Sequence, residues 1–165
     1  MNYKHSFYIS TFVLLLFIHM QSFASEKVSA GWIEKAMLYP DGIILHAKLD
    51  TGAETTSINA INPEFFERDK RRWARFSITN RDNESVTIEA KVIREANIKR
   101  HFGEKQVRPV IMLDICIGDV RKKEEVNLVD RSNLKYQLLI GRNFLKGDIL
   151  VDSGSTYIVS PDCSD

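Results

Sequence analysis

The sequence predicts an all-β fold, a barrel or an orthogonal sandwich, with one short helix near the C-terminal end. Short runs of alternating apolar and polar residues recur along the chain, and turn-forming residues separate them at intervals of about 8 to 12 residues. An amphipathic helix would instead place apolar residues three and four positions apart over several turns, and no stretch stands out with that period. The core is therefore expected to be built from strands.

The first two predicted strands enclose a turn. Residues 31–38 alternate weakly, residues 39–42 place proline and glycine where a β-turn needs them, and residues 43–49 form the return strand. On the return strand, alternate side chains form an apolar face and a partly polar face. The polar face includes His46, which is expected at the rim of the core and not as a ligand.

The middle of the chain predicts a hairpin. Residues 55–60 carry the chain away from the turn that follows residue 49, and Asn62-Pro63 breaks this segment ahead of residues 64–67 and a charged loop over residues 68–72. Apolar residues then alternate on both sides of a polar turn at residues 80–84. These alternating residues are Trp73, Phe76 and Ile78 before the turn and Val86, Ile88, Ala90 and Val92 after it. The mixed charges of residues 68–75 are interpreted as a solvated turn and strand face.

The last part of the chain predicts four further strands and the helix. Residues 94–106 are polar and lack a period, which leaves two alternatives open, a mobile flap over a cleft or a plain surface connection. Residues 107–117 are strand-like, and after a tight turn residues 120–129 return as a strand that is expected to be mostly exposed because of its mixed charges. An apolar strand from Leu138, a short helix at residues 143–146 and a terminal strand at residues 149–151 complete the order.

The N-terminal residues predict an export signal. Lys4 supplies the positive charge, residues 7–20 supply the apolar core, and small residues up to Ala24 supply the cleavage site. Polar residues interrupt the apolar run, which is shorter than the roughly 20 residues that span a bilayer. Cleavage is therefore favoured over retention as a membrane anchor. The sequence predicts a periplasmic or secreted protein with one domain over residues 25–165 and no membrane attachment after cleavage.

The charge balance and the two cysteines limit the partners and the covalent structure. After removal of residues 1–24, which contain one basic and no acidic residue, 22 basic and 22 acidic residues remain. This balance argues against a nucleic-acid partner, which would need a basic excess.

Cys116 and Cys163 would enter an oxidising compartment. The sequence leaves open whether they form a disulfide or whether Cys116 is a buried small residue beside a frayed tail.

The candidate catalytic residue is Asp50, which begins an Asp-Thr-Gly-Ala turn after the strand at residues 43–49. Thr51 offers a hydroxyl to a neighbouring segment, Gly52 allows backbone to approach the carboxylate, and Ala53 keeps the turn small. The same residue types are also common turn formers, so a purely structural Asp50 is the alternative.

A second motif gives the Asp50 turn its context. Residues 138–145 join an apolar strand to Ile140-Gly141-Arg142 and then to the short helix. Together, the Asp-Thr-Gly-Ala turn and this apolar-Gly-Arg-Asn segment resemble the paired signatures of retroviral-type aspartic proteases. The resemblance implies a compact retropepsin-like acid protease barrel, with Ile140, Gly141 and Arg142 near the catalytic turn.

Further pieces, in the same order, resemble a bacterial retropepsin-like family labelled putative ATP-dependent zinc proteases. They cover nearly the whole chain after the signal: Gly31-Trp32, Lys48 to Ala53, Phe65 to Asp69, Arg72-Trp73, Arg108-Pro109-Val110, Asp130-Arg131-Ser132-Asn133, Leu139 to Leu145 and Val151-Asp152. The label implies zinc and ATP. For zinc, the sequence has no His-Glu-x-x-His motif and no cysteine pair at metal spacing, and for ATP it has no phosphate-binding Gly-Lys-Ser/Thr loop. No metal site and no cofactor are predicted. The resemblance also implies that some members trim glutamate-containing peptides beside ATP-grasp ligases, a cytosolic role that an export signal opposes.

The resemblance implies an aspartic-type endopeptidase that acts on a peptide or protein. One chain offers one convincing catalytic turn, so a homodimer is predicted, in which Asp50 and its copy activate a water molecule. Asp152-Ser153-Gly154 echoes the turn, but too few residues follow it for a second lobe, and Asp152 is interpreted as structural. The alternatives are a non-catalytic peptide-binding or assembly module and a zinc-dependent peptidase.

Overall fold

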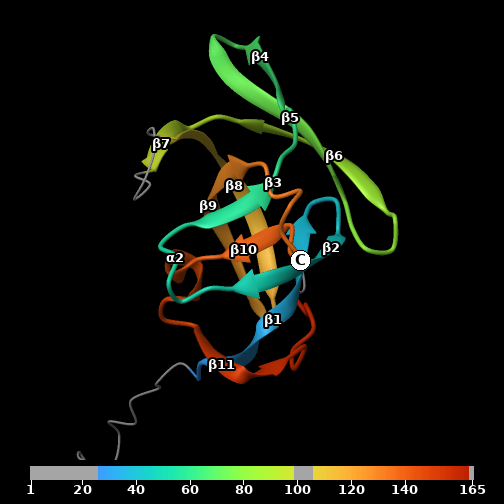
Figure 1. The fold of residues 1–165 in the computed structure, drawn as a ribbon, viewed down its shortest axis with the longest axis vertical. Helices are drawn as coiled ribbons and strands as arrows, with labels where there is room; N and C mark the ends of the chain where they lie inside the picture. The colour runs from blue at the N-terminus through green and yellow to red at the C-terminus, as the bar shows by residue number, and fades with distance from the viewer. Residues whose placement is uncertain (1–25, 99–105, 164–165) are drawn as a thin grey trace, which may run out of the picture.

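The computed structural model describes residues 26–98 and 106–163, and within them six strands form a closed barrel. Around the barrel the strands follow the order β1, β2, β10, β3, β9 and β8, and β8 pairs back with β1 (Figure 1). Their bounds are β1 Val28–Tyr39, β2 Ile43–Leu49, β3 Thr56–Asn59, β8 Gln106–Ile117, β9 Val120–Val129 and β10 Leu138–Ile140. The one helix in this part of the chain is α2, Arg142–Leu145. The prediction of a retropepsin-like barrel with one short helix is confirmed.

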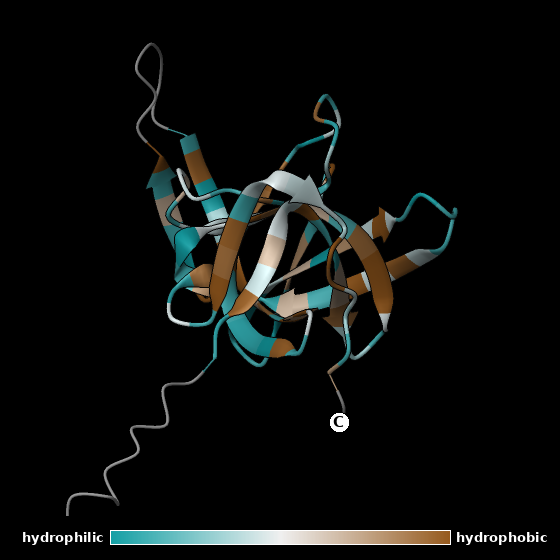
Figure 2. Cartoon of the chain, turned by 90° about the horizontal axis from the view of Figure 1, so that it is seen from below, coloured by the Kyte–Doolittle hydropathy of each residue, from teal (hydrophilic) through white to brown (hydrophobic). Residues whose placement is uncertain are grey.

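Alternation along the strands builds the barrel core. In β2, Leu45, Ala47 and Leu49 are buried, while Ile44 is exposed and His46 and Lys48 are half-buried, as the sequence predicts. Figure 2 shows the same pattern at the level of the whole chain, with apolar stretches on the barrel strands and hydrophilic residues on the loops. Each large aliphatic side chain buried in this way contributes about 1.5–3 kcal/mol relative to exposure.

A separate three-stranded sheet stands beside the barrel (Figure 1) and contains β4 (Glu64–Arg68), β5 (Arg71–Thr79) and β6 (Ser85–Lys91) in that order. The predicted hairpin corresponds to β5 and β6. The predicted charged loop over residues 68–72 is wrong, because only Asp69 and Lys70 connect the strands, both at positive φ. The arginines belong to the strands because aromatic rings cover their guanidinium groups, for example Arg72 at 4.2 Å above Phe65.

The segment predicted as a polar connection begins as a strand. β7 (Arg94–Ile98) pairs with the start of β8 and extends the barrel sheet at its edge. Most of its side chains are exposed on both faces, which removes the alternation that would have revealed a strand in the sequence. Residues 99–105, on which the flap hypothesis depends, lie outside the described residues.

The C-terminal residues are fastened to the barrel. β11 (Ile149–Thr156) runs parallel to β1 and is longer than the predicted strand at residues 149–151. Cys116 and Cys163 form a disulfide, which decides between the two alternatives left open by the sequence. The buried Glu34 carboxylate accepts hydrogen bonds from the backbone N–H groups of Gly31 (2.6 Å) and Ile158 (3.0 Å). The tail is therefore held by a covalent bond and by a buried polar group.

The export signal predicted over residues 1–24 lies outside the described residues. In the part of the chain that the structure covers, no helix is long and apolar enough to cross a bilayer.

Candidate active site

Asp50 stands at the end of β2, where the two sequence motifs meet. β10 pairs in parallel with β2 and places Ile140 beside Leu49. The Asp50 N–H continues this ladder by donating to the Ile140 carbonyl at 2.9 Å. Residues about ninety positions apart in the chain are thus adjacent at the candidate site.

Backbone hydrogen bonds brace the turn against α2. The Arg142 N–H donates to the Ala53 carbonyl at 2.9 Å, and the Asn143 N–H donates to the Glu54 carbonyl at 3.0 Å. Within the turn, the Ala53 N–H donates to the Asp50 carbonyl at 3.2 Å. The start of α2 therefore fixes the chain that follows Asp50.

The Arg142 guanidinium holds the same turn from outside. Its Nη1 donates to the carbonyls of Thr51 (3.1 Å) and Gly52 (2.8 Å). Two hydrogen bonds from a charged donor to one short segment stabilise it more than neutral bonds would. The structure thus brings the predicted residues Arg142, Thr51 and Gly52 together around Asp50.

Gly141 is required by a close backbone approach. A Cβ at this position would lie 2.5 Å from the Thr55 carbonyl carbon and 2.7 Å from the Glu54 oxygen. The Gly141 N–H donates to Thr56 Oγ1 at 3.1 Å in the buried interior. The segment can pack against the Asp50 turn only because this residue has no side chain.

The Asp50 carboxylate is held in place and remains 25% exposed. Oδ1 accepts the Gly52 N–H at 2.9 Å, and Oδ2 lies 3.2 Å from Lys48 Nζ. Desolvation by itself would raise the pKa of Asp50, but the hydrogen bond and charge of Lys48 and the Gly52 and Ala53 N–H groups together lower it below its ordinary value. In a single chain the carboxylate is therefore ionised and accessible.

Arg131 lies near Asp50, and in the sequence it stands out only as part of the Asp130-Arg131-Ser132-Asn133 piece of the family resemblance. Its side chain is buried, with Nη1 donating to Ser57 Oγ at 3.1 Å and Nε donating to the Tyr136 carbonyl at 3.1 Å. Desolvation and the neighbouring Arg108 lower the pKa of Arg131, while the charge of Asp50 raises it. No signal in the sequence separates this arginine from an ordinary loop arginine.

Thr51 is exposed in the single chain, and Ala53 is half-buried. The carbonyl of Thr51 accepts from Arg142, as described above. The expectation that the Thr51 hydroxyl bonds a neighbouring segment across a dyad stays a prediction.

Asp152 is engaged within its own strand. Its Oδ1 accepts the Gly154 N–H at 2.8 Å and its Oδ2 accepts the Ser155 hydroxyl at 2.7 Å. Among residues 26–98 and 106–163, no hydrogen bond or ion pair joins Asp152 to the Asp50 turn. Both aspartates thus accept an N–H two residues ahead, and their surroundings distinguish them.

A zinc ion does not fit the donor groups at hand. Across the two described ranges, no group of three or more His, Cys, Asp and Glu side chains could hold a metal ion. Both cysteines are in the disulfide, and His46 Nδ1 is hydrogen-bonded to the Tyr157 hydroxyl at 2.8 Å.

A cavity of about 560 Å³ lies beside the catalytic turn, between α2 and β11. Its lining includes Thr51, Arg142 and Leu150. Leu150 lies on the edge strand β11, and its large aliphatic side chain is 55% exposed.

Comparisons with known proteins agree with this geometry. A crystal structure of protein Lpg0085 from Legionella pneumophila, of unknown function, has a TM-score of 0.70, with 29% identity over 82% of this chain and 100% of that one. Two curated relatives are named probable alpha-L-glutamate ligase. The relative from Shewanella pealeana is 33% identical over 68% of this chain and 25% of its own length, and that from Parasynechococcus marenigrum is 32% identical over 81% and 29%. The chain thus spans about a quarter of the length of these relatives.

A family model described as the retropepsin-like aspartic endopeptidase RimB matches residues 29–162. The match includes the Asp50 turn, β10 and α2, which together build the site. Because it covers most of the chain, the protein belongs to the RimB-like family of retropepsin-like aspartic endopeptidases.

Proposed function

We propose that the protein is an exported aspartic-type endopeptidase that uses a pair of Asp50 residues from two identical chains. The observation that carries the proposal is the Asp50 carboxylate, which is fixed by the Gly52 N–H, partly exposed, and set in a turn braced by Ile140, Gly141 and Arg142. A turn former without a catalytic role needs no such bracing from a distant segment.

The chemistry follows from two carboxylates on opposite sides of one water molecule. The ionised Asp50 removes a proton from the water as its oxygen attacks the scissile carbonyl carbon, and the protonated Asp50 donates to the carbonyl oxygen. Two like charges so close cannot both be ionised at low cost, so the pair shares one proton. A second chain supplies the second carboxylate without a second gene.

The dimer proposal rests on the surface beside the turn. β11 is an edge strand, and the exposed Leu150 and the cavity against α2 adjoin Thr51. An isologous contact through this surface would bury apolar area and bring the two turns together. In that arrangement, the Thr51 hydroxyl of each chain bonds the opposite turn.

The basic groups near Asp50 favour acidic peptides as substrates. Arg131 is buried without a carboxylate partner among the described residues, and Lys48 lies 3.2 Å from Asp50. A buried unpaired charge is costly, and a substrate carboxylate would compensate it. The relatives named glutamate ligases agree with a glutamate-containing substrate, although that name belongs to proteins of which this chain matches about a quarter.

Export completes the proposal. The signal features of residues 1–24 support delivery to the periplasm or beyond. A peptidase there would meet acidic peptides outside the cytosol.

The test compares two aspartates with the same local hydrogen bond. A library of peptides, acidic and neutral, is digested with wild-type protein, Asp50→Asn and Asp152→Asn, and products are identified by mass. We expect Asp50→Asn to abolish cleavage with a melting temperature within a few degrees of wild type, because its side chain is not part of the core. Asp152→Asn should cleave as wild type does.

Two results would contradict the proposal. Equal cleavage by wild type and Asp50→Asn would show that Asp50 is not the catalytic residue, and absence of cleavage by wild type would leave a peptide-binding or assembly role for the barrel. Activity that is lost with a chelator and restored by zinc would favour the zinc peptidase.

A further inference from the structure

The small sheet beside the barrel ends in an open strand edge. β6 pairs with β5 on one side, and no described strand pairs with its other side. The Asn80 N–H donates to the Glu84 carbonyl and the Val92 N–H donates to the Arg72 carbonyl, both at 2.9 Å. These two bonds show which residue pairs of β5 and β6 exchange backbone hydrogen bonds. Along β6, even-numbered residues therefore bond to β5, and the odd-numbered ones direct their N–H and C=O groups to the open edge.

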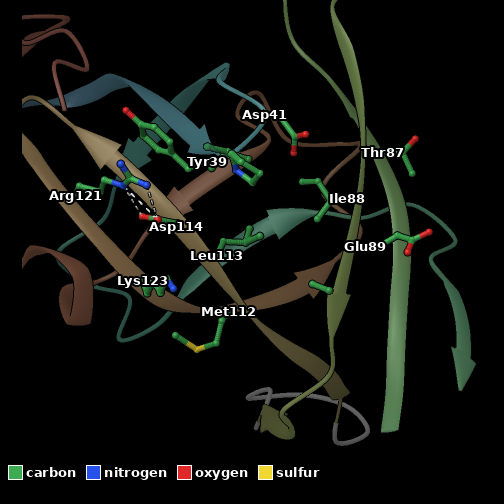
Figure 3. A pocket seen from close by; sticks show the side chains of 13 residues that line it. Tyr39, Asp41, Thr87, Ile88, Glu89, Met112, Leu113, Asp114, Arg121 and Lys123 are labelled. Atoms are coloured by element: carbon green, nitrogen blue, oxygen red, sulfur yellow. Dashed lines mark hydrogen bonds and ion pairs between the residues drawn. The ribbon is translucent and has the colours of Figure 1, made fainter. Parts of the chain in front are cut away.

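This open edge borders a cavity of about 560 Å³ between β6 and the barrel. Thr87 to Ala90 line one side, and Figure 3 shows Ile88 pointing toward the barrel while Thr87 and Glu89 point away from it. The outward backbone groups at the cavity are thus those of Thr87 and Glu89. The cavity has room for residues of an added chain.

The opposite wall comes from the barrel and is partly apolar. Leu38, Met112 and Leu113 line it, and Met112 is 40% exposed. β8 pairs with β7 as far as Val110 and with β1 from Asp114, so residues 111–113 have β9 as their only strand neighbour in the described part of the chain. The wall thus lies at a gap in the barrel sheet.

Charged groups lie on the wall next to these apolar side chains. Arg121 donates to Asp114 at 3.0 Å and covers the ring of Tyr39, and Lys123 and Asp41 also line the cavity (Figure 3). Both signs of charge are present, so the cavity does not select a strongly charged ligand.

We propose that the open edge of β6 binds an extended segment of a partner polypeptide, which adds to the small sheet as a fourth strand. The unpaired N–H and C=O groups of Thr87 and Glu89 match an extended backbone, which offers donors and acceptors at the same spacing. Alternate side chains of the segment would face the exposed Met112, so the partner carries apolar residues at every second position.

The other strand edges are less suited to bind an extended segment. β4 and β7 expose most of their side chains on both faces, and β11 adjoins the surface assigned to the dimer. β6 borders a cavity whose opposite wall comes from the barrel. A segment bound there would be enclosed from two sides, which provides selectivity as well as backbone hydrogen bonds.

The test uses an unfolded polypeptide, reduced and carboxymethylated α-lactalbumin, with Asp50→Asn protein so that cleavage plays no part. Amide hydrogen exchange is followed by NMR with and without the probe. We expect exchange at Thr87 and Glu89 to slow severalfold when the probe binds. The Ile88 amide, which bonds to β5, serves as an internal reference and should not change.

A pair of variants tests the backbone role. In the same Asp50→Asn protein, Thr87→Pro removes one outward N–H from an edge strand, where proline is tolerated, and Thr87→Ala removes the side chain alone. Binding of the labelled probe should weaken about tenfold for Thr87→Pro and stay unchanged for Thr87→Ala.

Three outcomes would overturn the proposal. They are absence of probe binding, binding that leaves Thr87 and Glu89 exchange unaltered, and protection without the probe that rises with protein concentration. The last would assign the edge to a second copy of this chain. Because these measurements use protein without Asp50, their result is independent of the proposed catalysis.

Discussion

At the scale of single residues, Gly141 is the position at the site where a side chain fits least. We predict that Gly141→Ala destabilises the protein by about 1–3 kcal/mol or more, because the added Cβ would overlap the backbone of residues 54 and 55. Urea unfolding measures the loss. Gly154→Ala is the matched control, since its Cβ would meet only Asp152 Oδ1 at 3.3 Å. Similar midpoints for the two variants would mean that the turn can shift away from β10 at little cost.

Lys48 is predicted to set the acid side of the activity profile. Lys48 helps lower the pKa of Asp50, so the ionised form persists to lower pH in wild type than in Lys48→Met. The acid limb of the pH–rate profile should therefore move to higher pH in Lys48→Met. Lys35→Met, which removes a lysine from the neighbouring strand β1, is the control and should leave the limb in place. An unshifted limb in Lys48→Met would show that the ion pair is absent from the active enzyme.

The same lowered pKa has a consequence for stability. A carboxylate with a lower pKa in the folded state stabilises the fold above its ordinary pKa, and this contribution disappears as the pH falls through the lowered value. Because Lys48 and Asp50 are both partly exposed, solvent screening keeps the contribution small.

At the scale of elements, the fastening of the C-terminal tail depends on Glu34. We predict that Glu34→Ala costs about 2–4 kcal/mol, because three backbone N–H groups, those of Gly31, Ile158 and Val159, lose their acceptor in or near the interior. Chemical denaturation with the disulfide intact isolates this effect. Glu67→Ala, on the exposed strand β4, should change stability by less than about 0.5 kcal/mol. If both variants unfold at the same denaturant concentration, the disulfide alone holds the tail.

At the scale of the whole molecule, the proposed dyad requires two chains. The activity of the solution should fall faster than linearly on dilution, because dissociation removes the second carboxylate. After equilibration with an equal amount of Asp50→Asn chains, only about a quarter of the dimers carry two aspartates, so activity per wild-type chain should fall by about half. Asp152→Asn chains mixed in the same way should not lower it. A monomer by light scattering with full activity would exclude the shared dyad.

Much of the fold and part of the site were predictable because they depend on local pattern. Alternation in β2 identified the buried face with Leu45, and turn chemistry identified the hairpin of β5 and β6. Asp50 and the Gly141-Arg142 pair were found because each belongs to a short motif. β7 and the strand nature of residues 64–68 were missed, because an edge strand exposed on both faces carries no alternation.

The sequence by itself therefore determined the all-β class, the succession of most strands along the chain and the two segments that build the site. Tertiary structure decided that β10 lies beside β2, that Cys116 reaches Cys163, and that Arg131 is buried near Asp50. It also decided that β6 ends its sheet beside a cavity. The physical reason is that periodicity and turn residues act over a few positions, whereas distances between side chains from distant segments arise only when the barrel closes.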